Sequence, residues 1–409
     1  MRVLHIHGYD HGGGAETVFN ITRRNPLVEE NYSGYIKEDM TDPGYSDVKF
    51  RIYSEFPFPM DILSYFFSMN NYNALNRFLT GKKIDVVHLH SFIGALSPSI
   101  LLPLKEYKKK NNIKIVQTVH EFNLVCPNSV LFNYKQNAIC EKCLSRKIKT
   151  PIITSGCDRR GNTYSFLKGI RSIISNNIIG HKDLLDAIIA PSELMKQKLI
   201  EGGIDGNKIT IVRNPIDEIK EEELRSKENI ICYFGRFSKE KNAGFILESF
   251  IKWKSEVKND FVLLLIGGGD EEAMLKEKAS QSPFAKDIVF KPFMPQAQLK
   301  TYLGNVKYFT MASKCYETAP MGILEAATFN ILSVVPNLGG MKETVEKIIK
   351  AGIIYNSDDS TSWCEAINRL EASYNDELNK LLMQKNRFKS EFGIDSYYRN
   401  IYSVYGGGL

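Results

Sequence analysis

The chain has 409 residues, of which 43% are hydrophobic and 24% are charged. That composition is typical of globular proteins, and the length predicts two domains of roughly two hundred residues each. The net charge of +6 is too small to indicate nucleic acid as a partner, although it suits phosphorylated ligands or an anionic membrane surface. The sequence has no run of eighteen apolar residues and opens on the strand-like MRVLHIHG, so neither a membrane-spanning helix nor a secretion signal is expected.

The first predicted elements are a strand, a glycine-rich turn and a helix. The apolar run RVLHIH precedes three glycines, among them Gly13 and Gly14, and a helical pattern begins at Ala15. Glycines let a ligand approach the backbone closely, and the N–H groups of a helix start attract anions. The same glycines would also serve simply to reverse the chain, and they fit the G-x-G-x-x-G dinucleotide fingerprint poorly.

Residues 51–80 are rich in aromatic side chains. A helix is expected after the break at Pro57 and Pro59, with most of these aromatic residues in the core. A surface that meets a membrane or an acceptor is the alternative. A further helix is predicted over LLPLKEYKKK, and it ends in three lysines that suit a helix C-terminus.

Histidines lie at the ends of two predicted strands. The strand IDVVHLH ends with His88 and His90, and IKIVQTVHEF places His120 at its end. Ligands gather at the carboxyl ends of parallel strands. Packed or hydrogen-bonded side chains remain the simpler interpretation of His88 and His90, whereas His120 is expected to donate to a substrate oxygen.

The segment of about 123–180 interrupts the alternation of strands and helices. It holds four cysteines in a C-x13-C-x2-C-x13-C pattern: Cys126, Cys140, Cys143 and Cys157. Four thiolates suit a structural zinc ion, although outer loops of thirteen residues are not those of a standard finger. Free or buried thiols are the alternative, and a disulfide framework is not expected in a reduced, cytoplasmic protein.

The alternation then returns and is interrupted once more by a charged run. Ser192 has the position of an N-cap for a helix that ends at Gly202, and ITIVRNPID predicts a short strand. The run EIKEEELRSKEN has few apolar residues, so we place the domain boundary there. The predicted domains are residues 1–215 and 229–390, followed by a tail helix over 391–409.

The second half opens like the first, with a strand, a glycine turn and a helix in IICYFGRFSKEKN. Arg236 and Lys241 flank this turn, where a guanidinium and an ammonium group would suit a diphosphate. A solvated basic loop is the alternative. Further strands are predicted in FVLLLIG, DIVFKPF and ILSVV.

The stretch from Tyr308 to Glu325 carries the strongest candidate site. It predicts a strand, a polar loop containing Glu317, and a helix that starts after Pro320 and places Glu325 in its second turn. The N–H groups at this helix start, near Gly322 and Ile323, suit phosphate. Two carboxylates and these amides would suit a hydroxyl-rich ligand with a diphosphate, although two glutamates at this spacing also occur by chance.

Taken in order, these motifs resemble the retaining, nucleotide-sugar-dependent glycosyltransferases of family 4 (glycosyl transferases group 1). The resemblance covers nearly the whole chain and rests on GGGAE, TVHEF, APSE, VRNPID, GRFSKEKN, LLLIGGGDE, ETAPMGILE and NLGGMKE. It implies the α/β GT-B fold, in which two Rossmann-like domains face one another across a cleft and a C-terminal helix crosses back to the first domain. Ala319 and Pro320, and residues 329–331, depart from the family pattern.

The resemblance also implies roles for individual residues. Glu317 would accept from hydroxyls of the donor sugar, and Glu325 from the ribose. Arg236 and Lys241 would neutralise the leaving diphosphate, assisted by backbone amides of Gly13, Gly14, Gly322 and Ile323. His120 would contact the donor sugar near the reacting carbon. No metal is expected to carry the catalytic charge.

The implied reaction moves a hexose-type sugar from a UDP- or GDP-sugar to a glycan or lipid-linked acceptor in surface polysaccharide biosynthesis. A cytoplasmic location, with peripheral contact at the inner face of the membrane, fits such an acceptor. An NAD-dependent oxidoreductase and a non-catalytic nucleotide-sugar-binding protein are the alternatives. A glycoside hydrolase fits poorly, because its two carboxylates must face each other across the scissile bond.

Overall fold

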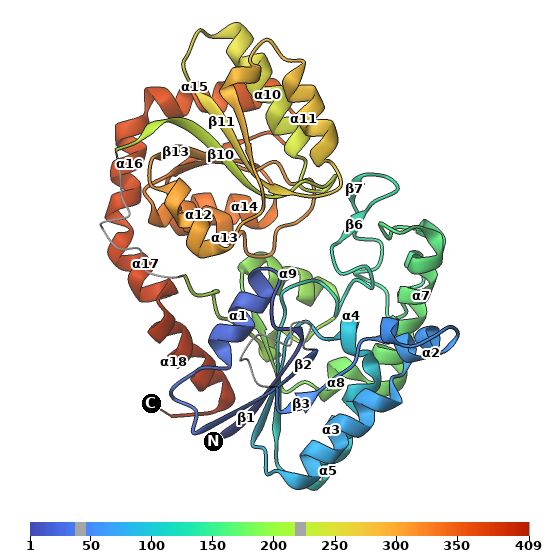
Figure 1. Cartoon of the computed structure of the whole chain (residues 1–409). Coiled ribbons are helices and arrows are strands. Elements are labelled where there is room, and N and C mark those ends of the chain that lie inside the picture. The colour runs from blue at the N-terminus through green and yellow to red at the C-terminus, as the bar shows by residue number, and fades with distance from the viewer. Residues whose placement is uncertain (37–45, 217–225, 409) are drawn as a thin grey trace. The chain divides into compact units, whose positions relative to one another are not determined.

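The computed structural model describes residues 1–36, 46–216 and 226–408, which form two compact units (Figure 1). Unit 1 comprises residues 1–136, 140–215 and 394–409, and unit 2 comprises residues 137–139 and 216–393. Most of the charged run 218–229, where the sequence placed the domain boundary, lies outside the described residues. No helix in the described part of the chain has the length and apolarity needed to cross a bilayer.

Unit 1 is built on a seven-stranded parallel sheet with the order β3-β2-β1-β4-β5-β8-β9. Its strands are β1 (Arg2–Tyr9), β2 (Glu30–Ile36), β3 (Val48–Lys49), β4 (Val86–Leu89), β5 (Lys114–Thr118), β8 (Ala187–Ala190) and β9 (Ile209–Ile211). Strands β1, β4 and β5 are almost wholly buried, as expected for parallel strands covered on both faces.

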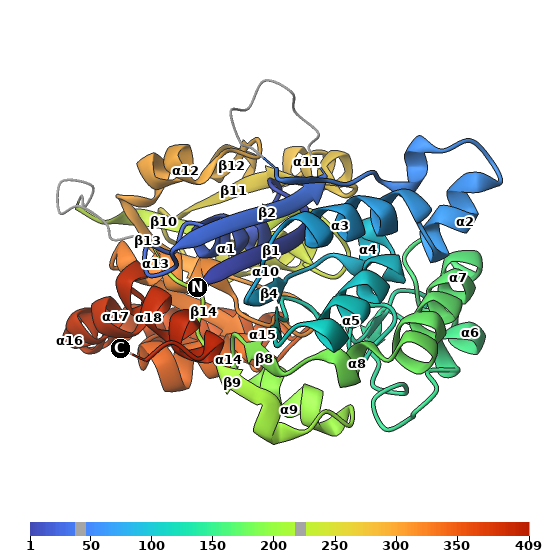
Figure 2. The same cartoon turned by 90° about the horizontal axis from the view of Figure 1, so that it is seen from below.

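Helices connect the strands of unit 1. They are α1 (Gly14–Thr22), η1 (Tyr53–Glu55), α2 (Met60–Phe66), α3 (Met69–Gly81), α4 (Ile93–Leu96), η2 (Pro98–Ile100), α5 (Leu101–Lys110), α6 (Pro151–Ser155), α7 (Asn162–Ser172), η3 (Ile173–Ile179), α8 (His181–Leu184), α9 (Glu193–Glu201) and η4 (Gly206–Lys208). Helices α3 and α5 lie side by side (Figure 2). The predicted cap of α9 is confirmed, since the Ser192 hydroxyl accepts from the Met195 N–H at 3.1 Å.

The C-terminal helix α18 (Ile394–Tyr405) belongs to unit 1, where it packs beside α1 (Figures 1 and 2). Its buried face includes Tyr397 and Ile401, which join a core cluster with Val3 and Val18. The Tyr397 hydroxyl lies 2.6 Å from Thr22 Oγ1 of α1. A buried hydrogen bond inside an apolar cluster therefore fixes this helix on the strand–helix pair that opens the chain.

Unit 2 repeats the architecture with a six-stranded parallel sheet of order β12-β11-β10-β13-β14-β15. Its strands are β10 (Glu228–Arg236), β11 (Val262–Gly268), β12 (Ile288–Lys291), β13 (Val306–Thr310), β14 (Leu332–Pro336) and β15 (Ile353–Tyr355). Its helices are α10 (Ala243–Glu256), α11 (Glu272–Ser280), η6 (Ala285–Asp287), α12 (Gln296–Leu303), α13 (Met321–Thr328), α14 (Gly339–Glu343), η7 (Thr344–Ile349), α15 (Ser360–Ala372), α16 (Tyr374–Met383) and α17 (Lys385–Phe392). Two parallel Rossmann-like sheets are thus confirmed.

One expectation about the core is wrong. Of the aromatic side chains in residues 51–80, only Tyr65 of α2 is buried. The Arg171 guanidinium of α7 lies over the Tyr65 ring at 4.4 Å, and α2 packs against α7 through this face. Phe58, in contrast, is 78% exposed and Leu63 is 64% exposed. Composition alone could not show that these side chains lie on a surface.

Candidate active site

The carboxyl ends of β10 and β11 form the rim on which the unit 2 site is built. Gly235 pairs with Gly267 there, and Arg236 pairs with Gly268. A Cβ atom on Gly267 would stand 1.9 Å from the Gly235 carbonyl oxygen, and its φ of +149° is one that other residues rarely adopt. These glycines therefore bring the two strand ends close together, and they place Arg236 and the following turn at the rim.

Lys241 and Glu317 meet at this rim. The Lys241 ammonium lies 2.5 Å from Glu317 Oε1, and the Ser313 hydroxyl donates to the same oxygen at 2.6 Å. The two charged side chains are 22% and 15% exposed, so the ion pair is largely shielded from water. The structure thus joins two residues that the sequence placed 76 positions apart.

The charges of this ion pair are well defined. Burial raises the pKa of the Glu317 carboxyl, but the Lys241 ammonium and the hydrogen bonds from Lys241 and Ser313 outweigh it and leave that pKa below its usual value. Burial lowers the pKa of Lys241, and the Glu317 carboxylate reverses this and raises the pKa above its ordinary value. Glu317 is consequently an anion with one oxygen engaged, and Lys241 is not an unpaired cation.

Arg236 has a different environment. Its side chain is 69% exposed, and Nη2 lies 3.8 Å from Oε1 of the buried Glu240. A guanidinium in that position is open to an incoming anion, because its link to the carboxylate is long. Arg236 is therefore better placed than Lys241 to meet a phosphate without first breaking a close ion pair.

The loop that carries Glu317 is held by the start of α14. A Cβ atom on Gly340 would stand 2.2 Å from the Glu317 carbonyl oxygen and 3.4 Å from Pro320 Cδ. Only glycine allows the backbones to approach so closely. The motif NLGGMKE thus has a packing role, because it fixes the loop from which the Glu317 side chain extends.

The start of α13 offers fewer N–H groups than the sequence suggested. The Met321 N–H donates to Ala319 O at 2.8 Å, and the Ile323 N–H donates to Pro320 O at 3.0 Å. For Gly322, the described residues provide no backbone acceptor. Gly322 also has a packing role, since an added Cβ atom would meet the Phe234 ring at 3.0 Å. The Ile323 amide could reach a phosphate only after it released Pro320.

Glu325 is half-buried in the second turn of α13, as predicted, and it has its own partner. Gln296 of α12 donates through Nε2 to Glu325 Oε1 at 3.0 Å. Both residues line a small cavity of about 10 Å³ together with Lys300 and Thr328. A carboxylate accepts hydrogen bonds only, which suits the hydroxyl donors of a diol.

The glycine turn of unit 1 is already capped by a side chain. Gly13 is the N-cap of α1, and its N–H donates to Glu16 Oε2 at 2.8 Å. An anion that used the Gly13 amide would have to displace this carboxylate. Gly14, the first residue of α1, follows in the same turn.

His120 and the other buried histidines of unit 1 form a network beside β1, β4 and β5. His120 Nε2 lies 3.1 Å from His90 Nδ1, with the two rings stacked at 5.4 Å. His88 contacts the Tyr405 hydroxyl and Thr118 Oγ1, each at 2.7 Å. His88 and His90 are fully buried, so their interpretation as packed and hydrogen-bonded side chains is confirmed.

Burial keeps these histidines neutral. It lowers the pKa of His120 to about 4 and holds those of His88 and His90 well below the ordinary value. Neutral His120 can donate from one ring nitrogen only. If the donor sugar takes that hydrogen bond, His90 Nδ1 must be the partner that donates to His120 Nε2.

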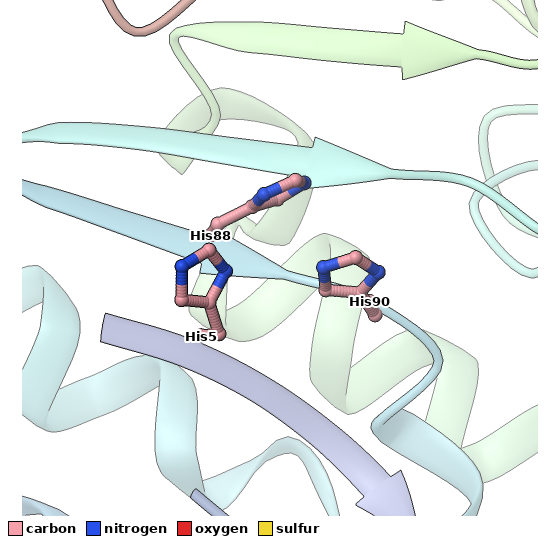
Figure 3. A group of neighbouring side chains, drawn as sticks. All are labelled: His5, His88 and His90. Atoms are coloured by element: carbon pink, nitrogen blue, oxygen red, sulfur yellow. The ribbon is translucent and has the colours of Figure 1, made fainter. Parts of the chain in front are cut away.

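His5 of β1 lies beside His88 and His90, and the three rings are close enough together to bind one metal ion. Potential ligand atoms of His5, His88 and His90 lie within 4.8 Å of one another, and Figure 3 shows His5 extending from β1 toward the two histidines of the neighbouring β4 segment. His5 also contacts Asn31 Oδ1 at 2.9 Å. Both ring nitrogens of His88 already have partners, so His88 is not free to bind a metal ion.

Sequence reasoning missed three residues of the unit 2 site. Ser313 and Gln296 complete the environments of Glu317 and Glu325, and Glu240 is buried beside Arg236. In the run SKEK only Lys241 was predicted to belong to the site, because nothing in the charge pattern indicates that Glu240 is buried. Arg236, Lys241, Glu317, Gly322, Ile323 and Glu325 lie in unit 2, whereas Gly13, Gly14 and His120 lie in unit 1.

Two parallel-sheet units of this kind, with a charged site at the strand ends of the second, define the GT-B class of glycosyltransferases. HepE of Anabaena, solved in complex with UDP, superposes with a TM-score of 0.67 at 13% identity, over 99% of this chain and 100% of that one. The outer core galactosyltransferase WaaB superposes with a TM-score of 0.62 at 14% identity, over 99% of both chains.

The family follows from two sequence models matched in chain order. Glycosyltransferase Family 4 matches residues 17–219, and Glycosyl transferases group 1 matches residues 215–387. The chain therefore belongs to the glycosyltransferases that these two models describe.

Curated relatives are distant. The amylovoran biosynthesis glycosyltransferase AmsK of Erwinia amylovora is 23% identical over 54% of this chain, and the match spans 56% of its own length. An uncharacterized 41.2 kDa protein in the cps region of Klebsiella pneumoniae is 22% identical over 99% of this chain and 100% of its own. The first of these relatives is named for the biosynthesis of the polysaccharide amylovoran.

Proposed function

We propose that this protein moves a hexose-type sugar, with retention of configuration, from a UDP- or GDP-sugar to a glycan or lipid-linked acceptor. The observation that carries the proposal is the shielded Lys241–Glu317 ion pair with Ser313, at the strand ends of unit 2. A carboxylate held ionised in a half-buried site is a strong acceptor for sugar hydroxyls. That HepE was solved with UDP-glucose supports a nucleotide-sugar donor here.

In the proposed reaction, the bond between the anomeric carbon and the diphosphate oxygen breaks, and its electron pair leaves with the diphosphate. The acceptor hydroxyl attacks from the same face, and its proton passes to the departing phosphate oxygen. Negative charge builds on the diphosphate as the bond breaks, so fixed cations and N–H groups lower the barrier. Arg236 is the exposed cation that would bind the leaving diphosphate. The Lys241 ammonium has three N–H donors, so it can contact the phosphate while it remains paired with Glu317.

The remaining assignments rest on the family resemblance. Glu325 would bind the ribose hydroxyls through its carboxylate, with Gln296 fixing its orientation. His120 would contact the sugar, and Gly14 and Gly322 would supply backbone N–H groups to the donor. Gly13 and Ile323 would do so after they release Glu16 and Pro320. The residues present can carry the charge, so we propose that catalysis needs no metal ion.

For the acceptor, we propose that the exposed apolar side chains around α2 meet a lipid chain or the cytoplasmic face of the membrane. Phe58, Met60 and Leu63 are each more than half exposed. Apolar side chains at this density suit an interfacial segment. Co-sedimentation with vesicles of anionic phospholipid should fall for Phe58→Asp/Leu63→Asp, and unchanged sedimentation would refute this part.

The donor assignment is tested by calorimetric titration of UDP and GDP into the full chain. Lys241→Met should weaken binding of the preferred nucleotide at least about tenfold, or about 1.4 kcal/mol, because it removes a cation and leaves Glu317 unpaired. Lys278→Met is the matched control, since Lys278 forms an exposed ion pair with Glu248 elsewhere in unit 2. Binding of NAD instead of either nucleotide would favour the oxidoreductase alternative.

A further inference from the structure

The loops that follow β5 in unit 1 bring the four cysteines of the C-x13-C-x2-C-x13-C pattern together. All four line one cavity of about 10 Å³, which is the volume of a single small ion or water. Cys126, Cys143 and Cys157 are 5 to 7% exposed, and Cys140 is half-buried. We call this group the cysteine cluster.

Hydrogen bonds between the loops hold the cysteine cluster in place. The Cys140 N–H donates to Leu131 O at 2.9 Å, which ties the C-x2-C turn to the loop after Cys126. The Tyr134 N–H and the Asn128 side chain both donate to Cys157 O, at 3.2 and 2.9 Å. The cysteines are therefore brought together by a preformed backbone framework.

Polar groups lie around the cysteine cluster. Burial raises the pKa of the Cys126 thiol, and the nearby backbone N–H groups of Leu131, Asn128 and Ser129 oppose this in part. Thiolate ligands of metal ions require such outer donors, which orient the sulfur and share its charge. The buried Lys149 ammonium, which donates to Cys143 O at 2.7 Å, adds a positive charge beside the cluster.

The segment around the cysteine cluster has little regular structure. Between Val119 and Gly161 the regular elements are the two-residue strands β6 (Phe132–Asn133) and β7 (Ala138–Ile139) and the five-residue helix α6. Buried apolar side chains such as Phe122, Leu131 and Phe132 lie in this segment, and short lobes with little regular structure are commonly stabilised by disulfides or metal ions. All four cysteines are free thiols in the structure.

We propose that the cysteine cluster binds one zinc ion with a structural role. Four cysteine sulfurs complete a tetrahedral site, which leaves no open position for substrate or water. Each thiol must lose its proton on binding. The His5, His88 and His90 group is the one set in the described residues whose ligand atoms already lie within 4.8 Å of one another, so the four sulfurs must draw closer around the ion.

Without a bound metal ion, burial opposes the loss of the thiol protons. It raises the pKa of Cys126 to about 11 and that of Cys143 to about 12, and neighbouring cysteines raise both further. A divalent cation would reverse this repulsion, because the thiolates then face opposite charge. Zinc binding should consequently release protons and stabilise unit 1.

The test is metal analysis of the full chain, purified under reducing conditions with any affinity tag removed. We expect about one zinc ion per chain. The substitution Cys143→Ser should remove most of the bound zinc. Cys364→Ser is the matched control, because Cys364 is equally buried but lies in unit 2 and should leave the zinc content unchanged.

A second measurement covers the case in which Cys143→Ser does not fold. Wild-type protein loaded with cobalt(II) should show the thiolate-to-metal charge-transfer band and the intense visible bands of a tetrahedral sulfur site. Absence of metal from the wild type, retention of zinc by folded Cys143→Ser, or a disulfide within the cluster in mass spectrometry would each overturn the proposal. None of these measurements depends on transferase activity.

Discussion

Acidification should destabilise unit 1 strongly, because its histidines are buried in the neutral form. Burial lowers the pKa of His5 and His120 to about 4, and that of His7 and His181 to about 3. In the unfolded chain the same groups titrate near about 6.5. Between these values the unfolded state binds protons and the folded state does not, so stability is full above pH 6.5 and is lost as the pH falls.

The size of the effect follows from linkage. Lowering the pH from about 7.5 to about 5.5 costs about 1.3 kcal/mol for one histidine that is protonated only when unfolded. The four histidines with those pKa values therefore cost about 5 kcal/mol, which is comparable to the whole stability of many domains. His88 and His90 act in the same direction.

The assay is urea unfolding followed by circular dichroism at a series of pH values. His181→Gln should reduce the pH slope of the free energy of unfolding by about 1.2 kcal/mol per pH unit near pH 5.5, since one proton-binding group is removed. A free energy of unfolding that stays constant down to pH 5.5 would refute the assignment of neutral, buried histidines.

Two further substitutions test how particular contacts act. Gly340→Ala should lower transferase activity because the new Cβ atom displaces the Glu317 loop, at a cost of about 1–3 kcal/mol in stability. Gly244→Ala in α10 should instead keep full activity, since its Cβ atom meets only an ordinary contact, and equal activity of the two variants would contradict the packing role. Tyr397→Phe should lower the free energy of unfolding by about 1 kcal/mol through loss of its bond to Thr22, and no change in urea unfolding would show that this bond is unimportant.

Much of the architecture could be predicted from the chain, because strand and helix periodicity is local. The cap at Ser192 and the positions of Glu317 and Glu325 follow from patterns of a few residues, and the structure confirms them. The two-sheet fold could be predicted because strands, glycine turns and helices recur in both halves.

The contacts within the site could not be predicted in the same way. The Lys241–Glu317 ion pair depends on the order of the strands in the sheet. The hydrogen bond from the Gly13 N–H to the Glu16 carboxylate depends on the side-chain conformation of Glu16. The close approach of Gly340 to the Glu317 loop is a tertiary contact that no local pattern encodes. The prediction that the aromatic residues of 51–80 lie in the core failed at Phe58 for another reason, because apolar composition does not distinguish a core from a surface.

In the proposed function, the site around Lys241 and Glu317 binds a nucleotide sugar and cleaves it. The most direct measurement is release of nucleoside diphosphate from a panel of UDP- and GDP-sugars, with and without membrane extract as a source of acceptor. We expect release from one donor, stimulated by acceptor, and a fall of about 10²–10³-fold in Glu317→Gln. The exposed control Glu248→Gln should retain full activity, because its ion pair lies away from the site. Release from no donor, or equal rates in the wild type and Glu317→Gln, would contradict the account.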